Sequence, residues 1–451
     1  MKFMSIDSRG QFGSRVGAVL VAAGSSVGLG NIWRFPYVMG ENGGAAFLLV
    51  YVCCILLIGL PIMLGEFAIG RATGKNAVGA YKALSPKWTA LGYCGMLASF
   101  FIMGFYFVVA SWTADYFVCS VSGELAKYSS AEEYASLFHN FINTPWKLIG
   151  YTWLFILATH VIIHMGVNKG IERISKILMP VLFVILIVMA AKSLTMSNSR
   201  EGLEFMFNPD FSKITPQVII QALGQAFFSL SVASGCLITY ASYFNKTTNL
   251  RTAAFQVTLL DTFVAILSGV IIFPACFSVG VTVGAGEGLV FVTLPGIFNQ
   301  MAGGVVWSSV FFLLLVIAAL TSTIAQHEVA TSYIIDEWKL SRGKAAVVTT
   351  LLVGVLATVA ALSLSVWSGY RLFDMRVFDL LDKCTANLLI PLGGFFTTIF
   401  VGWRMERAMF VGQLTNYGEL KPTFVKSIIF LLKYVCPIIM MIIFLDNIGV
   451  M

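Results

Sequence analysis

The chain consists of long apolar runs separated by short polar stretches that carry Lys, Arg, Asn, Gly and Pro. A helix that crosses a bilayer needs about 20 apolar residues, and eleven runs meet this requirement. They cover 12–37, 44–70, 90–120, 147–166, 170–192, 216–244, 252–282, 304–336, 344–366, 377–403 and 425–446. The pattern predicts an all-α integral membrane protein of about eleven spans, with no soluble domain between them.

Composition and charge add a topology to this prediction. Hydrophobic residues make up 58% of the chain and charged residues only 11%, which is more apolar surface than a water-soluble fold could bury. Lys and Arg concentrate in alternate loops, and the positive-inside rule then places the N-terminus in the cytoplasm and, after eleven spans, the C-terminus outside. We expect a multi-pass protein of the plasma (inner) membrane without a removable signal peptide. The net charge of +7 is explained by this topology, so no nucleic-acid partner is expected. No obligatory protein partner is evident from the sequence either.

Cysteine and histidine give no sign of metal chemistry. The eight Cys lie mostly within predicted spans, and none forms a C-x-x-C pair, so we interpret them as small core residues. His160 and His164 stand four residues apart on one helix face, but no third ligand lies near them in the sequence.

Two of the predicted spans are interrupted near their middle. The first contains GSSVGLGN at 24–31, followed by Arg34 and Pro36, and the sixth contains FFSLSVASG at 227–235. Unwound backbone at membrane depth persists only where it is buried in protein or lines a polar cavity. Small residues also allow close helix packing in lipid, which is the favoured interpretation for 43–44 and 65–70, but packing does not explain Asn31 and Arg34 at depth.

The spacing of the two interruptions suggests an internal repeat. Spans one and six are five apart, so a single transporter domain, 1–451, is predicted to contain two inverted five-helix halves, 12–192 and 216–403, and an extra helix, 425–446. Interrupted helices at corresponding positions of two halves point to the binding site of a secondary transporter.

The chemistry of a broken helix suits a cation and a carboxylate. Carbonyls at the end of one half bind a hard cation such as Na⁺, and the N–H groups that begin the other half attract an anion. The side-chain oxygens of Asn31, Ser229, Thr321 and Ser322 are candidates to complete the ligand shells. Asp261, inside span seven, has no obvious cationic neighbour and would be stabilised by Na⁺ or carry a proton, whereas Glu66 and Glu328 are interpreted as structural.

The motifs also resemble a known family. The segments GSSVGLGNIWRFP (24–36), ENGGAAF (41–47), GLPIMLGEFAIGR (59–71), GIERISKILMP (170–180), 225–243 and 320–342 are similar to those of a bacterial member of the neurotransmitter:sodium symporter family. This resemblance implies two sodium sites. The first would use the Ser26 carbonyl, Asn31, Ser229 and Asp261, and the second would use the carbonyls of Gly24, Val27 and Ala318 with the hydroxyls of Thr321 and Ser322.

The resemblance further implies a substrate pocket and two gates. The substrate contacts would be Ser26, Leu29, Gly30, Ile102, Tyr106, Phe227, Phe228, Ser229, Ser231, Ser234, Ser322 and Gln326. Tyr106 would bond the substrate carboxylate, and Phe228 would close over it. Arg34 and Asp382 would form the outer gate, although a static ion pair is an alternative. Arg9, Phe12, Tyr243 and Asp336 would form the inner gate, and a Pro ten residues after Gly170 would let span five unwind.

Three departures from the family pattern shape the predicted function. Asp261 replaces a common Asn, and Ala265 stands where the family carries a chloride-binding Ser or a Glu, so we expect chloride-independent transport with possible proton counter-movement. Ser234 and Gln326 replace apolar residues, which favours a large side chain such as that of Trp, Tyr or Phe, although a polar amino acid also fits. The chain ends after eleven spans, where some relatives have a twelfth, which leaves the oligomeric state open.

The sequence therefore predicts a sodium-coupled symporter that imports an amino acid by alternating access, with no organic cofactor. The alternatives are a membrane sensor that binds an amino acid, a sodium-coupled transporter of another small amine, and a channel. An intramembrane enzyme is not expected, because the sequence has no Ser/His/Asp or H-E-x-x-H arrangement.

Overall fold

The computed structural model describes residues 10–281 and 288–450, which fold into helices and one isolated bridge between Leu372 and Met375. Nine helices in these ranges are long and apolar enough to cross a membrane. They are Ala45–Thr73 (α3 and α4), Pro86–Val121 (mainly α6, Thr89–Val121), Pro145–His164 (α8), Val167–Ser193 (mainly α9, Arg173–Ser193), Leu250–Ser278 (α13), Gly304–Trp338 (α15), Arg342–Leu364 (α16), Val377–Arg404 (α17 and α18) and Val425–Asn447 (α20 and α21). Each overlaps a predicted span.

The first predicted span is a bent pair of helices. The helix α1 (Arg15–Ser26) begins where the Ser14 side chain accepts a hydrogen bond from the Gly17 N–H at 3.0 Å. It ends at Val27, and the chain continues as Gly30–Glu41 (including α2, Phe35–Glu41) at an angle of 55°. Counted as one span, this pair raises the number in the described ranges to ten.

The remaining predicted span, 216–244, consists of two short helices. The helix α11 (Pro216–Ser229) begins behind the Thr215 cap, and α12 (Cys236–Ala241) follows a non-helical segment, 230–235. Within this segment Ser231 and Ala233 have φ of 52° and 64°. A positive φ is costly for residues other than glycine, so surrounding contacts must hold this backbone in place. Neither helix is long enough to cross a membrane alone, and the non-helical segment between them is the second interruption.

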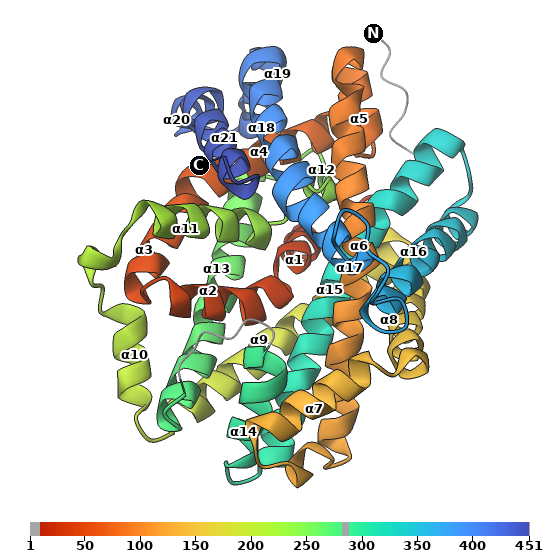
Figure 1. Ribbon diagram of the computed structural model, residues 1–451. Coiled ribbons are helices and arrows are strands. Elements are labelled where there is room, and N and C mark those ends of the chain that lie inside the picture. Colours follow the sequence, from red (N-terminus) through yellow and green to blue (C-terminus); the bar gives the residue numbers. More distant parts are fainter. Residues whose placement is uncertain (1–9, 282–287, 451) are drawn as a thin grey trace.

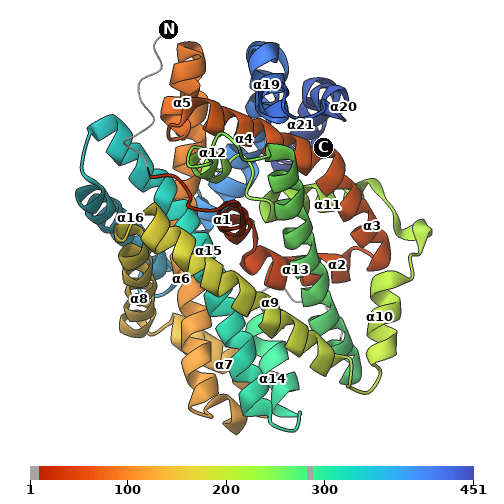
Figure 2. The ribbon, with the colours of Figure 1, turned by 180° about the vertical axis from the view of Figure 1, so that it is seen from behind.

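The two interrupted helices lie inside the bundle. In Figure 1, α1 and α2 (red) are at the centre, with α6 (orange), α11 and α13 (greens) and α15 (teal) around them. Figure 2 shows the opposite side, where α9 crosses α1, α13 and α15 and contacts all three. Both views place the short helices α7 and α14 at one end and α5 and α19 at the other.

The short helices were not part of the predicted pattern. They are α5 (Ala77–Leu84), α7 (Ala131–Ile142), α10 (Ser199–Phe207), α14 (Leu294–Asn299) and α19 (Arg407–Thr415). Most lie between spans, and α7 begins with a capping box formed by Ser130 and Glu133. They cover the ends of the spans and leave the centre of the bundle to the two interruptions.

Candidate binding site at two broken helices

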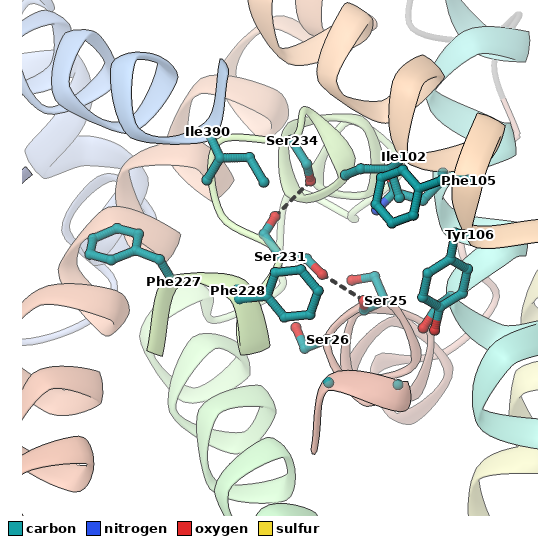
Figure 3. Close-up of a pocket in the computed structure, with 14 residues that line it drawn as sticks. Ser25, Ser26, Ile102, Phe105, Tyr106, Phe227, Phe228, Ser231, Ser234 and Ile390 are labelled. Carbon is teal, nitrogen blue, oxygen red and sulfur yellow. Dashed lines mark hydrogen bonds between the residues drawn. The ribbon is translucent and has the colours of Figure 1, made fainter. Parts of the chain in front are cut away.

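The two interruptions are bonded to each other. The Ser231 hydroxyl donates to the Ser25 carbonyl at 2.7 Å, and the Ser26 hydroxyl donates to the Leu230 carbonyl at 3.2 Å. Ser234 then donates to the Ser231 carbonyl at 2.8 Å, and Figure 3 shows both the Ser231 and the Ser234 bonds at the edge of a pocket. Side chains of each break thus satisfy backbone carbonyls that helix formation leaves unpaired.

A buried polar cluster lies beside the first break. The Asn31 amide donates to Asp261 Oδ1 at 2.7 Å and to Ser229 Oγ at 2.8 Å, and Ser229 Oγ donates to Asp261 Oδ2 at 2.8 Å. Asn31 and Asp261 are 0% exposed, and no Lys or Arg in the described ranges forms an ion pair with Asp261. A buried carboxylate without a cationic partner is costly. Oxygen donors of this kind suit a hard cation.

A second group of oxygens lies between the end of α1 and the middle of α15. The Ser322 hydroxyl is 3.4 Å from the Val27 carbonyl, and the Thr321 hydroxyl donates to the Ala318 carbonyl at 3.0 Å. A Cβ atom on Gly24 would lie 3.5 Å from Thr321 Cβ. The structure therefore brings together all five residues that the sequence assigned to a second sodium site.

A pocket lies between the two breaks, α6 and α18 (Ile390–Ile399). It is lined by Ser25, Ser26, Gly28, Gly30, Ile102, Phe105, Tyr106, Phe227, Phe228, Ser231, Ser234, Ser322, Gln326 and Ile390. Ten of the twelve predicted substrate contacts are in this lining. Of the other two, Ser229 belongs to the Asp261 cluster, and Leu29 lines a neighbouring cavity while its N–H donates to the Tyr106 hydroxyl at 3.3 Å.

Four lining residues were missed by the sequence reasoning. Ser25 and Gly28 lie within the first interruption, so the signal that identified the break also covered them. Phe105 is three residues after Ile102 on α6, close enough to share its helix face. Ile390 had no signal of its own, because its span was connected to the site only through Asp382.

A wider cavity adjoins the pocket on the side of Arg34 and Asp382. Both residues line it, but they form no ion pair with each other among the described residues. Instead the Arg34 guanidinium lies 4.6 Å from the centre of the Phe228 ring. Phe228 lines both cavities and so stands between them.

Comparison with known proteins identifies the family. A model of the sodium:neurotransmitter symporter family matches residues 9–141 and 134–451. The chain belongs to this family. The sodium-dependent transporter YhdH of Bacillus subtilis is 35% identical over 443 residues, 98% of each chain. A sodium-dependent transporter of Haemophilus influenzae is 37% identical over 452 residues, which cover 97% of this chain and 98% of the relative.

The crystal structure of MhsT in complex with L-phenylalanine is similar to this symporter throughout. The two share 41% sequence identity, and the match has a TM-score of 0.89 over 98% of this chain and all of MhsT. The fold of the chain is thus that of the family. The protein is a sodium-dependent membrane transporter and not an enzyme.

The end of the symporter opposite the wider cavity is tightly packed. Phe12 is 2% exposed, its N–H donates to the Tyr243 carbonyl at 3.0 Å, and the two rings meet edge-on at 5.8 Å. Asp336 accepts hydrogen bonds from the backbone and side-chain N–H groups of Asn76 at 3.0 and 2.8 Å. Arg9, the other residue predicted for this gate, lies outside the described residues.

Two buried side chains hold the interruptions of the symporter and had no assigned site role. Glu66, 0% exposed on α4 (Leu60–Thr73), accepts a hydrogen bond from the Ala233 N–H at 2.8 Å. Gln225 on α11 donates to the Gly30 carbonyl at 3.1 Å. Each satisfies a backbone group that a continuous helix would have paired internally, which explains how the strained Ala233 backbone persists.

Proposed function

We propose that this transporter imports an amino acid together with sodium by alternating access. The observation that carries the proposal is the pocket enclosed by both helix breaks, with apolar walls and polar backbone at one edge. The Tyr106 hydroxyl lines this pocket, accepts a hydrogen bond from the Leu29 N–H, and would donate to the substrate carboxylate. The complex of MhsT, a relative of similar fold, with L-phenylalanine supports this substrate class.

Two sodium ions would be carried at the two oxygen clusters. The first ion would bind Asn31, Ser229, Asp261 and the Ser26 carbonyl, where it would compensate the buried Asp261 carboxylate. The second would bind the Gly24, Val27 and Ala318 carbonyls with the hydroxyls of Thr321 and Ser322. Each charge that moves down a potential of 100 mV releases about 2.3 kcal/mol, so two ions would support steep accumulation.

Chloride would not be required for this cycle. Ala265 is 0% exposed and lies one helical turn from Asp261 on α13, and its methyl group offers no ligand for an anion. The Asp261 carboxylate would supply the negative charge that balances sodium.

Alternating access would use the two gates at opposite ends of the pocket. With the N-terminus in the cytoplasm, the wider cavity faces outward, and Phe12 and Tyr243 close the inner side. Closure would bring Phe228 over the substrate and Arg34 to Asp382. A four-helix unit would then rock against the remainder of the bundle to open the inside.

A thermal-shift panel of the twenty amino acids in Na⁺ and in K⁺ tests this proposal. Stabilisation by an amino acid in Na⁺ alone is expected, and equal shifts in K⁺ would contradict sodium coupling. Uptake of the stabilising amino acid into vesicles under an inward Na⁺ gradient then distinguishes a symporter from a sensor, which would bind without accumulation. A shift produced by other amines, but by no amino acid, would support the alternative substrate class.

A further inference from the structure

Gln326 is a polar residue of the pocket with an unused hydrogen-bond acceptor. It lies on α15, is 6% exposed, and lines the pocket between the two breaks. Its Oε1 atom is buried and has no hydrogen-bond partner among the described residues. A buried amide without a partner loses the hydrogen bonds that water would give it, so a ligand that supplies a donor is favoured there.

The serine side chains of the lining differ from Gln326, because each is already bonded to a backbone carbonyl. All five serine hydroxyls have a backbone carbonyl as hydrogen-bond partner. These pairs are Ser25 with Ala22 at 2.7 Å, Ser26 with Leu230 at 3.2 Å, Ser231 with Ser25 at 2.7 Å, Ser234 with Ser231 at 2.8 Å and Ser322 with Val27 at 3.4 Å. The serines therefore shape the backbone of the pocket, and the Gln326 amide and the Tyr106 hydroxyl are left for the ligand.

The position of Gln326 matches the side-chain end of a bound amino acid. Ser322 and Gln326 are four residues apart on α15, so they share one helix face and are separated by about 6 Å along its axis. Ser322 lies at the first break, beside the Val27 carbonyl. The wall of the pocket also includes Ile102, Phe105 and Ile390, and none of the fourteen lining residues is charged.

We propose that Gln326 selects an aromatic amino acid whose ring carries a hydrogen-bond donor, tryptophan or tyrosine, over phenylalanine. The inference rests on the proposed function and names the substrate class of the same pocket. The apolar wall favours a ring, the absence of charge in the lining disfavours Lys, Arg, Asp and Glu, and the unpaired amide oxygen favours an indole N–H or a phenol O–H. Phenylalanine would bury the amide without a partner, a mismatch against which polar sites discriminate strongly.

Binding to the purified full-length transporter in Na⁺ tests the inference. The ligands are L-tryptophan, L-tyrosine, L-phenylalanine and 1-methyl-L-tryptophan, in which the indole N–H is blocked. The variants are Gln326→Leu, which removes the amide at similar size, Gln326→Met as a second apolar replacement, and Gln256→Leu as a control at an exposed position of α13. We expect the wild type and the control to bind tryptophan or tyrosine about tenfold or more tightly than phenylalanine and 1-methyl-L-tryptophan. The Gln326 variants should reduce that preference to about twofold or less, mainly through tighter binding of phenylalanine.

Two results would overturn the inference. One is wild-type binding of phenylalanine and 1-methyl-L-tryptophan as tight as that of tryptophan and tyrosine, a comparison that needs no variant. The other is a preference that persists in a folded Gln326 variant. In either case sodium-dependent binding of the four ligands would leave the proposed function standing. If none of the four binds in Na⁺ the inference fails as well, and the panel of twenty amino acids then decides the proposed function separately.

Discussion

Asp261 offers the sharpest test of the sodium assignment, because its carboxylate is buried at 0% exposure without a cationic side chain. Replacement by Asn keeps the size and removes the charge. The bond from the Asn31 amide at 2.7 Å can persist, since an Asn oxygen can accept it. The Ser229 hydroxyl, which donates to the carboxylate at 2.8 Å and accepts from Asn31 and Tyr51, can keep its bond if it donates to the same Asn oxygen. The substitution therefore removes the charge with little other change.

The expected loss in sodium affinity follows from the attraction between the ion and the carboxylate. Two unit charges 4 Å apart attract by about 4 kcal/mol at an effective dielectric constant of about 20, and the cost of burying the carboxylate offsets part of this. A net loss of roughly 2 to 4 kcal/mol corresponds to a rise of about 30-fold to 700-fold in the sodium concentration for half-saturation. Without sodium, Asp261→Asn should be as stable as the wild type or more so, because an uncompensated charge is gone.

Thermal unfolding is measured over a series of NaCl concentrations, with KCl added to constant ionic strength. It gives both the sodium concentration for half-saturation and the stability of each variant without sodium. Asp374→Asn is a matched control, since this residue is exposed in the loop between α16 and α17. A half-saturating sodium concentration unchanged by Asp261→Asn would refute the reasoning. A melting temperature several degrees below the wild type in K⁺ would show instead that the carboxylate is needed by the fold.

Three further outcomes are expected. Gly30→Ala should weaken substrate affinity, measured by thermal shift, about tenfold or more, because the added Cβ would lie 2.8 Å from Phe228 Cε1. The control Gly224→Ala should have no effect, because its Cβ would meet nothing within 4 Å. Arg342→Met should lower the free energy of unfolding by about 3–5 kcal/mol in denaturant titrations, since it leaves Glu328, 0% exposed and now paired at 2.6 Å, without its cation; a change under about 1 kcal/mol would contradict this. Replacing chloride by gluconate should leave uptake into vesicles unchanged, and a strict chloride requirement would refute chloride independence.

The membrane explains why most of the fold is predictable from the sequence. Lipid cannot satisfy backbone groups, so spans appear as long apolar runs, and small polar residues inside such a run are visible as an interruption. Both interruptions are present in the structure at the predicted places. The short helices such as α5 and α10 were not predicted, because neither has the length of a span and ordinary amphipathic segments between spans give a weaker signal.

Contacts between residues far apart in the chain could not be predicted from the sequence. Glu66 reaches the Ala233 N–H across 167 residues, and nothing in either segment identifies the other as its partner. The sequence suggested Asp382 as the partner of Arg34 from opposite charge and from the place of both near the outer side, whereas the structure places Arg34 on the Phe228 ring. Charge complementarity indicates which groups can pair, but the conformation of the bundle decides which pair is formed.

In the proposed cycle, the contact between Arg34 and Phe228 would connect occupancy of the pocket to closure of the outer gate. A guanidinium over an aromatic face contributes about 0.5–2 kcal/mol, so moving Arg34 to Asp382 gives up this contact and gains an ion pair at the mouth of the wider cavity. The two terms are similar in size, so these two contacts alone would favour neither arrangement in the empty transporter. Because Phe228 also lines the pocket, a ring bound beneath it would replace part of the lost contact and shift the balance toward closure. The gate would then respond to the substrate with no residue dedicated to sensing it.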